Sequence, residues 1–242
     1  MKPKHTISVI VLTRNEENIV ENNIKKIYDF LSSLDFFKNF EILVCDYSDD
    51  NTPTILKHIS EKYSKIRFIP VKKRGIGIGL KTGIKKVNYE IIIFYPIDLS
   101  WDLQVIVDSF RMILNNVDIV LGSRECKGSI VKRRLKRRIF SKLYNLLINF
   151  LFDLHIKDTQ CTMMFKKSDI DYFIDKIPSD NAFFQTEFLI YAKKNNLKII
   201  EIPVFVKDYR KSRNIKPIRY GFLMLRQIIK RFKEFRLNIR FF

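Results

Sequence analysis

The sequence has little glycine, little proline, few cysteines and no long apolar run. Only 7 glycines and 7 prolines occur among 242 residues, which excludes collagen-like and low-complexity proteins. The three cysteines, Cys45, Cys126 and Cys161, are odd in number, widely spaced, and form no CxxC pair or Cys/His cluster. A disulfide framework and a structural zinc site are therefore not expected, and a reducing, cytoplasmic compartment is favoured.

The apolar runs are also too short for a membrane-spanning helix. The most apolar stretch, residues 143–152 (LYNLLINFLF), is well below the about twenty residues that a spanning helix needs. The basic N-terminus, MKPKHTISVIVL, contains only a short apolar run, so we expect a first β-strand there and not a signal peptide.

Positive charge, in contrast, is abundant and is concentrated in two segments. The chain has 45 Lys and Arg against 26 Asp and Glu, for a net charge of +19. Residues 127–142 carry eight basic and no acidic side chains, and residues 209–242 carry eleven basic and one acidic. The rest of the chain is nearly neutral. Two cationic segments of this kind favour phosphate groups on nucleotides, anionic lipids or nucleic acids.

Both cationic segments contain apolar residues, and each has two interpretations. Residues 127–142 are predicted to be helical and either expose a solvated basic face or contact phosphate or anionic lipid. The tail from Lys216 is predicted to be an amphipathic helix that either docks on the protein core or lies among lipid headgroups.

Elsewhere, apolar runs alternate with helical periodicity, and 46% of the residues are hydrophobic, enough for a substantial core. Buried strands are predicted at residues 7–12, 41–45, 66–71, 90–95, 117–121 and 198–206, with helices between them and another helix over 181–194. This alternation predicts an α/β fold with a mostly parallel central sheet flanked by helices.

Polar clusters follow four of the predicted strands. They are TRNE (13–16), DYSDDNT (46–52), PID (96–98) and GSR (122–124). Because ligands of parallel sheets bind at the carboxyl ends of the strands, these clusters predict a nucleotide or phosphate site.

Two acidic features of these clusters have alternative roles. Asp98 can bind Mg²⁺ or Mn²⁺ together with a nucleotide diphosphate, or it can cap a helix over residues 101–114. Asp46, Asp49 and Asp50 crowd one strand end, where they either accept hydrogen bonds from a nucleoside or form a solvated turn with a capping aspartate.

Two further motifs lie outside these strand ends. The segment RGIGIGLKTG (74–83) does not satisfy the Gly-x-Gly-x-x-Gly spacing, so a Rossmann site is not favoured. Its glycines are expected to let a loop pack beside bound diphosphate. Glu187 has aromatic neighbours and is either a base of raised pKa or a carboxylate paired with a nearby cation.

In this order the segments resemble the family 2 inverting glycosyltransferases of the GT-A fold, and most closely their dolichyl-phosphate mannosyltransferase and polyprenyl-phosphate glycosyltransferase branch. The resemblance extends over residues 5–213. It rests on VLTRNEENI (11–19), EILVCDYSDDNT (41–52), RGIGIGLKTGI (74–84), PIDLS (96–100), GSR (122–124), RRIFSKLYNLLINFLF (137–152), DTQCTMMFKK (158–167), FFQTEFLIYAKKNNLKIIEIPV (183–204) and RKSR (210–213).

The resemblance implies a GT-A domain over residues 1–213, a basic amphipathic tail helix over 214–242, and specific site residues. The implied nucleotide-sugar ligands are Leu12, Arg14, Glu16, Asp46, Ile97 and Asp98, of which Asp98 would also hold Mg²⁺ or Mn²⁺. The implied phosphate or acceptor ligands are Arg124, Arg138, Ser141, Arg210 and Arg213. Asp98 and Glu187 would be the catalytic residues.

The activity implied by the resemblance is inverting transfer of a sugar from a GDP- or UDP-linked donor to a polyprenyl or dolichyl phosphate. The chain would lie peripherally on the cytoplasmic face of a membrane, through an anionic lipid surface or a membrane-protein partner. The Asp-x-Asp element of the family reads Pro96-Ile97-Asp98, without its first carboxylate. A non-catalytic nucleotide- or membrane-binding subunit is therefore the alternative, while nucleic-acid binding is not favoured.

Overall fold

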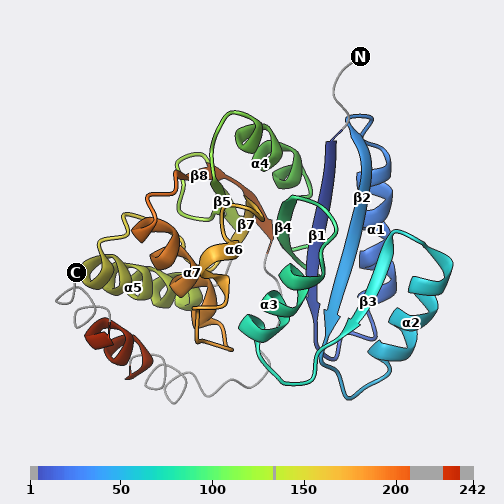
Figure 1. The fold of residues 1–242 in the computed structure, drawn as a ribbon, viewed down its shortest axis with the longest axis horizontal. Coiled ribbons are helices and arrows are strands. Elements are labelled where there is room, and N and C mark those ends of the chain that lie inside the picture. Colours follow the sequence, from blue (N-terminus) through green and yellow to red (C-terminus); the bar gives the residue numbers. More distant parts are fainter. Residues whose placement is uncertain (1–4, 133–134, 208–225, 235–242) are drawn as a thin grey trace.

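The computed structural model describes residues 5–132, 135–207 and 226–234 (Figure 1). The strands are β1 (His5–Thr13), β2 (Phe37–Asp46), β3 (Ile66–Pro70), β4 (Ile91–Pro96), β5 (Ile119–Ser123), β6 (Ile130–Lys132), β7 (Thr162–Lys166), β8 (Ile199–Pro203) and β9 (Phe205–Lys207). A seven-stranded sheet has the order β3-β2-β1-β4-β7-β5-β8, in which only β7 runs antiparallel to its neighbours. Strands β6 and β9 form a separate parallel pair.

Helices cover both faces of the sheet. They are α1 (Val20–Ser32), α2 (Thr52–Lys62), α3 (Ile76–Lys86), α4 (Gln104–Leu114), α5 (Leu135–Phe152), α6 (Asp171–Ile174) and α7 (Phe183–Lys194), and residues 226–234 are also helical. Helices α1, α2 and α4 pack in one apolar core, and α3, α5, α7 and the 226–234 helix pack in a second core on the opposite face. This three-layer arrangement confirms the predicted fold class.

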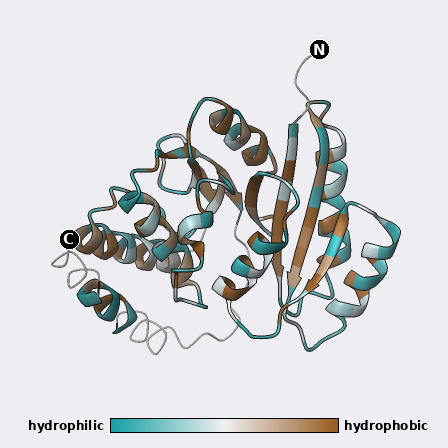
Figure 2. Ribbon diagram, in the orientation of Figure 1, coloured by the Kyte–Doolittle hydropathy of each residue, from teal (hydrophilic) through white to brown (hydrophobic). Residues whose placement is uncertain are grey.

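The strands are apolar because both of their faces are buried. On β1, Ile7, Val9 and Val11 enter one core, while Ile10 enters the other and Leu12 packs against it. Figure 2 shows the resulting hydrophobic colouring of the central strands. Polar residues are thereby confined largely to the strand ends.

The glycines of α3 bring this helix close to β1. A Cβ at Gly83 would lie 2.8 Å from Ile10 Cγ2, and one at Gly79 would lie 2.9 Å from Leu12 Cδ2. The glycine-rich segment therefore serves packing within the protein, in addition to any role beside a ligand.

Three local predictions were wrong or incomplete. Residues 130–132 are strand β6 where a helix was expected, and α5 begins only at Leu135. The single strand expected over 198–206 is divided after Pro203, which lacks an N–H, into β8 and β9. Strand β7 was not predicted, because its three apolar residues, Met163, Met164 and Phe165, show no period that distinguishes a strand from a buried helix.

Three further predictions concern membrane spans, the domain boundary and the cysteines. Within the described ranges, no helix has the length and apolarity needed to cross a membrane. The proposed domain boundary after residue 213 lies outside the described residues, as does most of the predicted tail helix. The three cysteines are free thiols.

A buried carboxylate ties the first half of the sheet together. Glu41 on β2 is 3% exposed and accepts hydrogen bonds from Ser8 Oγ on β1 (2.7 Å) and Asn88 Nδ2 after α3 (2.8 Å). Its Oε2 also forms an ion pair with Arg67 Nη1 on β3 at 2.6 Å. Glu41 thus joins three strands and the connection into β4.

We predict that Glu41→Ala lowers the free energy of unfolding by about 2–4 kcal/mol, because the groups that donate hydrogen bonds to the carboxylate lose their buried acceptor. Glu61→Ala on the exposed side of α2 is the matched control and should change it by less than about 0.5 kcal/mol. Urea unfolding checks both values. Equal unfolding midpoints for the two variants would contradict a structural role for Glu41.

Candidate functional site

The loops after β1 and β2 form one hydrogen-bonded unit. The N–H of Asn15 donates to Ser48 Oγ (2.8 Å), and the N–H of Glu16 donates to Thr52 Oγ1 (2.9 Å). In the opposite direction, the N–H of Asp49 donates to Asn15 Oδ1 (3.1 Å). Asn15 has a φ of 55°, a left-handed conformation that asparagine tolerates better than most residues. The two polar clusters therefore hold each other in place.

The crowded aspartates of the second loop are stabilised by donors of the protein. Asp46 is 4% exposed, and its Oδ1 accepts hydrogen bonds from Thr13 Oγ1 (2.7 Å) and Ser48 Oγ (2.6 Å). Asp50 Oδ1 accepts from the N–H of Thr52 at the start of α2 (2.9 Å). Asp50 therefore caps the start of α2, which is one of the two roles expected for these aspartates. Asp46 joins the ends of β1 and β2.

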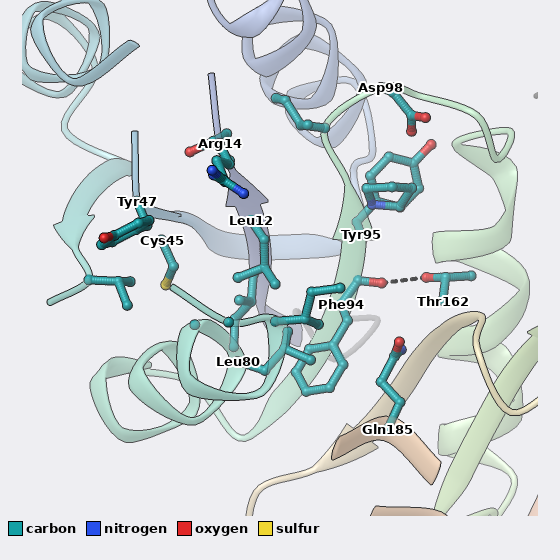
Figure 3. Close-up of a pocket in the computed structure, with 18 of the residues that line it drawn as sticks. Leu12, Arg14, Cys45, Tyr47, Leu80, Phe94, Tyr95, Asp98, Thr162 and Gln185 are labelled. Atoms are coloured by element: carbon teal, nitrogen blue, oxygen red, sulfur yellow. Dashed lines mark hydrogen bonds between the residues drawn. The ribbon is translucent and has the colours of Figure 1, made fainter. Parts of the chain in front are cut away.

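A pocket of about 480 Å³ opens where β1, β2 and β4 end (Figure 3). Its volume is in the range of small-molecule sites. Five of the predicted nucleotide-sugar ligands line it: Leu12, Arg14, Glu16, Ile97 and Asp98. The sixth, Asp46, lies behind the lining, while its neighbour Tyr47 is in the pocket and 41% exposed.

Asp98 sits in a tight turn at the end of β4. Its Oδ1 accepts hydrogen bonds from Ser100 Oγ (2.7 Å) and from the N–H of Ser100 (3.2 Å). Leu99 between them has a φ of 50°, a conformation that costs a leucine energy and recurs at functional sites. Helix α4 is capped instead by Asp102, whose Oδ1 accepts from the N–H of Gln104 (2.8 Å), so the capping alternative for Asp98 is wrong.

The Asp98 carboxylate fits a metal ion whose remaining coordination positions are filled by a bound ligand and water. In the described ranges, no three His, Cys, Asp or Glu side chains converge on one point that could hold a metal. Mg²⁺ commonly takes only one or two protein carboxylates and fills its remaining positions with substrate phosphates and water. A pocket-lining carboxylate such as Asp98 matches that mode and does not match an all-protein metal cage.

Arg124, predicted to bind phosphate, is engaged by the protein itself. Its Nε and Nη2 each donate to a carboxylate oxygen of Asp158 at 2.7 Å, and Nη2 also donates to the carbonyl of Gln160 at 2.6 Å. The guanidinium lies 5.3 Å from the ring centroid of Trp101, a pocket residue. Burial alone would raise the pKa of Asp158, but the hydrogen bonds and charge of Arg124 outweigh it and hold this pKa below its usual value.

The other predicted residues that the structure describes, Arg138, Ser141 and Glu187, are not among the pocket-lining residues. Arg138 is exposed and Ser141 is half-buried on α5, and Arg210 and Arg213 lie outside the described residues. Glu187 on α7 is fully buried: its Oε2 accepts from the N–H of Ser179 at 3.0 Å, and its Oε1 is 2.6 Å from Arg231 Nε. The paired-carboxylate alternative therefore describes the contacts of Glu187, and its catalytic role stays a prediction.

Several pocket residues were not predicted from the sequence. They are Tyr47, Arg74, Trp101, Thr162 and Gln185. Tyr47 and Arg74 stand inside motifs already noted, so their positions beside Asp46 and Gly75 were a usable signal. Thr162 and Gln185 reach the pocket through β7 and α7, and no local pattern indicates that these elements meet β4 there.

We predict that Arg124→Met lowers the free energy of unfolding by about 3–5 kcal/mol at neutral pH, because Asp158, 1% exposed, loses its buried partner. The lowered pKa of Asp158 makes this stabilisation present above about pH 4 and lost as the pH falls through the folded-state pKa. The difference from wild type should therefore shrink in acid.

Urea unfolding between pH 7 and pH 3 measures this trend. Arg111→Met, which removes an exposed ion pair with Asp108, is the control, with an expected change below about 1 kcal/mol. A difference between Arg124→Met and wild type that stays constant across this pH range would contradict the assignment.

Comparison with known proteins identifies the family of the chain. The model of glycosyl transferase family 2 matches residues 8–173. Glycosyltransferase AglD of Haloferax volcanii is 25% identical over 202 residues, covering 82% of this chain and 32% of AglD, so the chain spans about a third of that relative. The dolichyl-phosphate hexose transferase of Haloferax volcanii is 22% identical over 236 residues, 96% of each chain.

A solved structure shares the architecture. Glucosyl-3-phosphoglycerate synthase from Mycobacterium tuberculosis, in complex with Mn²⁺, UDP and glucosyl-3-phosphoglycerate, superposes with a TM-score of 0.67 at 18% identity. The match covers 93% of this chain and 77% of the synthase, which shows a shared GT-A fold. Because the family model spans more than half of the sequence, from β1 into α6, the chain belongs to glycosyl transferase family 2.

Proposed function

We propose that the chain is an inverting glycosyltransferase that moves a sugar from a nucleotide-sugar donor to a polyprenyl or dolichyl phosphate. One observation carries the proposal: a pocket of nucleotide-sugar size gathers Arg14, Glu16 and Asp98 at the carboxyl ends of parallel strands. The name of the dolichyl-phosphate hexose transferase, which is similar over nearly its whole length, supports the acceptor class.

The donor is a GDP- or UDP-linked sugar, with its nucleoside at the ends of β1 and β2. Leu12 and Tyr47 offer apolar contact area to a base, while Arg14 and Glu16 supply a donor and an acceptor for hydrogen bonds. Asp46 is not itself a lining residue; it holds the ends of β1 and β2 together by accepting hydrogen bonds from Thr13 and Ser48. The diphosphate then points toward Asp98 at the end of β4.

Asp98 would hold Mg²⁺ or Mn²⁺ together with the donor diphosphate. When bound, such a cation supplies positive charge that stabilises the departing diphosphate. Arg14 and Arg74 also line the pocket, and their charges offset the same developing negative charge.

The reaction is a single displacement. An oxygen of the acceptor phosphate forms a bond to the anomeric carbon as the bond from that carbon to the donor phosphate oxygen breaks. The bonding electron pair leaves with the nucleoside diphosphate, and the anomeric configuration inverts. Because the acceptor phosphate is already ionised, no side chain has to remove a proton, in keeping with the burial of Glu187 away from the pocket.

We predict that Asp98→Ala lowers kcat for nucleotide-sugar turnover with Mn²⁺ by about 10²- to 10³-fold, the usual cost of removing stabilisation of a developing charge. Asp108→Ala, which removes an exposed carboxylate on α4, should retain wild-type turnover. The fluorescence of Trp101, the single tryptophan and a pocket residue, measures UDP and GDP binding independently.

Two results would redirect the proposal. A wild-type protein that binds UDP or GDP but turns over no nucleotide sugar supports the non-catalytic subunit. A wild-type protein that binds neither nucleotide contradicts the proposed site.

We also propose that α5 rests on the cytoplasmic face of an anionic membrane, where the acceptor headgroup lies. Its outward stripe, at helical spacings of three and four residues, consists of Leu135, Ile139, Leu143, Leu146 and Phe150, all at least 50% exposed, with Phe140 beside it. Arg138 and Lys142 are exposed on the same helix and can meet lipid phosphates. Arg138 and Ser141 are then positioned to bind the acceptor phosphate, with Arg210 and Arg213 as further candidates.

We predict that Leu143→Ser with Leu146→Ser lowers binding to liposomes containing anionic lipid by at least about tenfold, since each buried leucine contributes about 1.5–3 kcal/mol. Leu114→Ser, at an exposed position at the end of α4, is the matched control and should bind as wild type does. Flotation in a density gradient measures the bound fraction. Wild-type protein that fails to float at any anionic-lipid content would favour a membrane-protein partner.

A further inference from the structure

The helix over residues 226–234 is docked on the protein through specific contacts. Ile228 is 1% exposed and belongs to the same core as α7, and the ring of Phe232 contacts that of Phe152 with centroids 5.9 Å apart. Gln227 Nε2 donates to Ser179 Oγ (2.7 Å), and Asn181 Nδ2 donates to Gln227 Oε1 (2.9 Å). The described part of the tail thus packs against the loop before α7.

An ion pair joins this helix to α7. Arg231 Nε lies 2.6 Å from Glu187 Oε1, with the Glu187 side chain 0% and the Arg231 side chain 18% exposed. The other carboxylate oxygen of Glu187 accepts from the N–H of Ser179 (3.0 Å). One buried carboxylate therefore connects the tail helix to residue 179. Burial raises the pKa of Glu187, while Ser179 and Arg231 favour its charged form.

The loop at residues 179–181 in turn supports one wall of the pocket. The Asp180 carbonyl accepts from the N–H of Ile78 (3.2 Å), and the Asp180 carboxylate pairs with Lys73 (2.9 Å) and Lys81 (3.1 Å). A Cβ at Gly75 would lie 2.1 Å from the Asp180 carbonyl oxygen, so the two backbones are in direct contact.

The supported wall belongs to the pocket itself. Its lining residues from this segment are Arg74, Gly75, Ile76, Gly79 and Leu80. Contacts thus run without a break from Arg231 through Glu187 and residues 179–181 to the wall at 74–80.

We propose that the helix over residues 226–234 is a clamp that positions the pocket wall at residues 74–80 for the nucleotide, with Arg231 as its positioning residue. In the described part of the chain, Arg231 pairs with Glu187 and Glu234, so it acts on the wall through Glu187 and the 179–181 loop. The inference rests on the proposed nucleotide site, and it gives Glu187 a role different from that of a base.

The test compares the full-length wild type with Arg231→Met, Arg231→Lys and Lys233→Met. Lys233 is exposed on the same helix, so Lys233→Met removes the same charge without touching α7. Hydrogen exchange of the amides at 74–80 reports on the wall without any ligand, and Trp101 fluorescence gives the Kd for UDP and GDP with Mn²⁺.

We expect Arg231→Met to speed exchange at 74–80 and to raise the Kd for the bound nucleotide about 3- to 30-fold. In the turnover assay KM should rise by a similar factor while kcat changes less, since the clamp binds no reacting atom. Arg231→Lys should recover most of the wild-type affinity, and Lys233→Met should match wild type. Gln227→Ala, which removes only the hydrogen bonds to Ser179 and Asn181, should give a smaller change in the same direction and replaces Arg231→Met if that variant fails to fold.

The inference is overturned if exchange rises at 226–234 but stays at the wild-type rate at 74–80. An unchanged nucleotide Kd in both Arg231→Met and Gln227→Ala overturns it as well. If the wild type binds neither UDP nor GDP, the proposed nucleotide function fails, and the exchange measurement still decides whether the tail helix holds the wall.

Discussion

The fold depends on the burial of both faces of its central strands. Once β1, β2 and β4 are covered by helices on either side, polar side chains along them must either find a buried partner, as Ser8 and Glu41 do, or stand where a strand ends. In a mostly parallel sheet several of those ends lie at one edge, so the same constraint that builds the core also assembles the site. The pocket is in this sense a consequence of the sheet.

Much of this could be predicted from the sequence, because the signals are local. An apolar run such as residues 7–12 indicates a strand buried on both faces, and the polar residues directly after it indicate a site. Arg14, Glu16 and Asp98 fall in those polar clusters, while Leu12 is indicated only by the family resemblance, and the structure brings all four to one pocket. Asp98 in particular needed only its position at the end of an apolar run.

What could not be predicted are the partners of charged residues across the chain. The guanidinium of Arg124 is paired with Asp158, which is distant in the sequence, and no local pattern indicates this pair. Burial raises the pKa of Glu187, as its aromatic neighbours in the sequence indicate, but its pairing with Arg231 has no signal in the sequence. Neither pair has a sequence spacing that a helix or hairpin would impose, so only the tertiary fold decides between a free and a paired charge. Strand β7 was missed for a related reason, since its place between β4 and β5 is set by long-range pairing.

The antiparallel direction of β7 has a consequence for how the molecule is divided. The chain leaves the sheet at the end of β5 and returns at the start of β7, and these two points lie at the same edge. The ion pair between Arg124 and Asp158 joins the two ends of this connection, and the segment between them includes β6 and the whole of α5. Between these ends, β6 is fixed by pairing with β9 and α5 by burying Ile148 in the core. The exposed stripe of α5 makes neither contact, so its sequence can change without altering the register of the seven-stranded sheet.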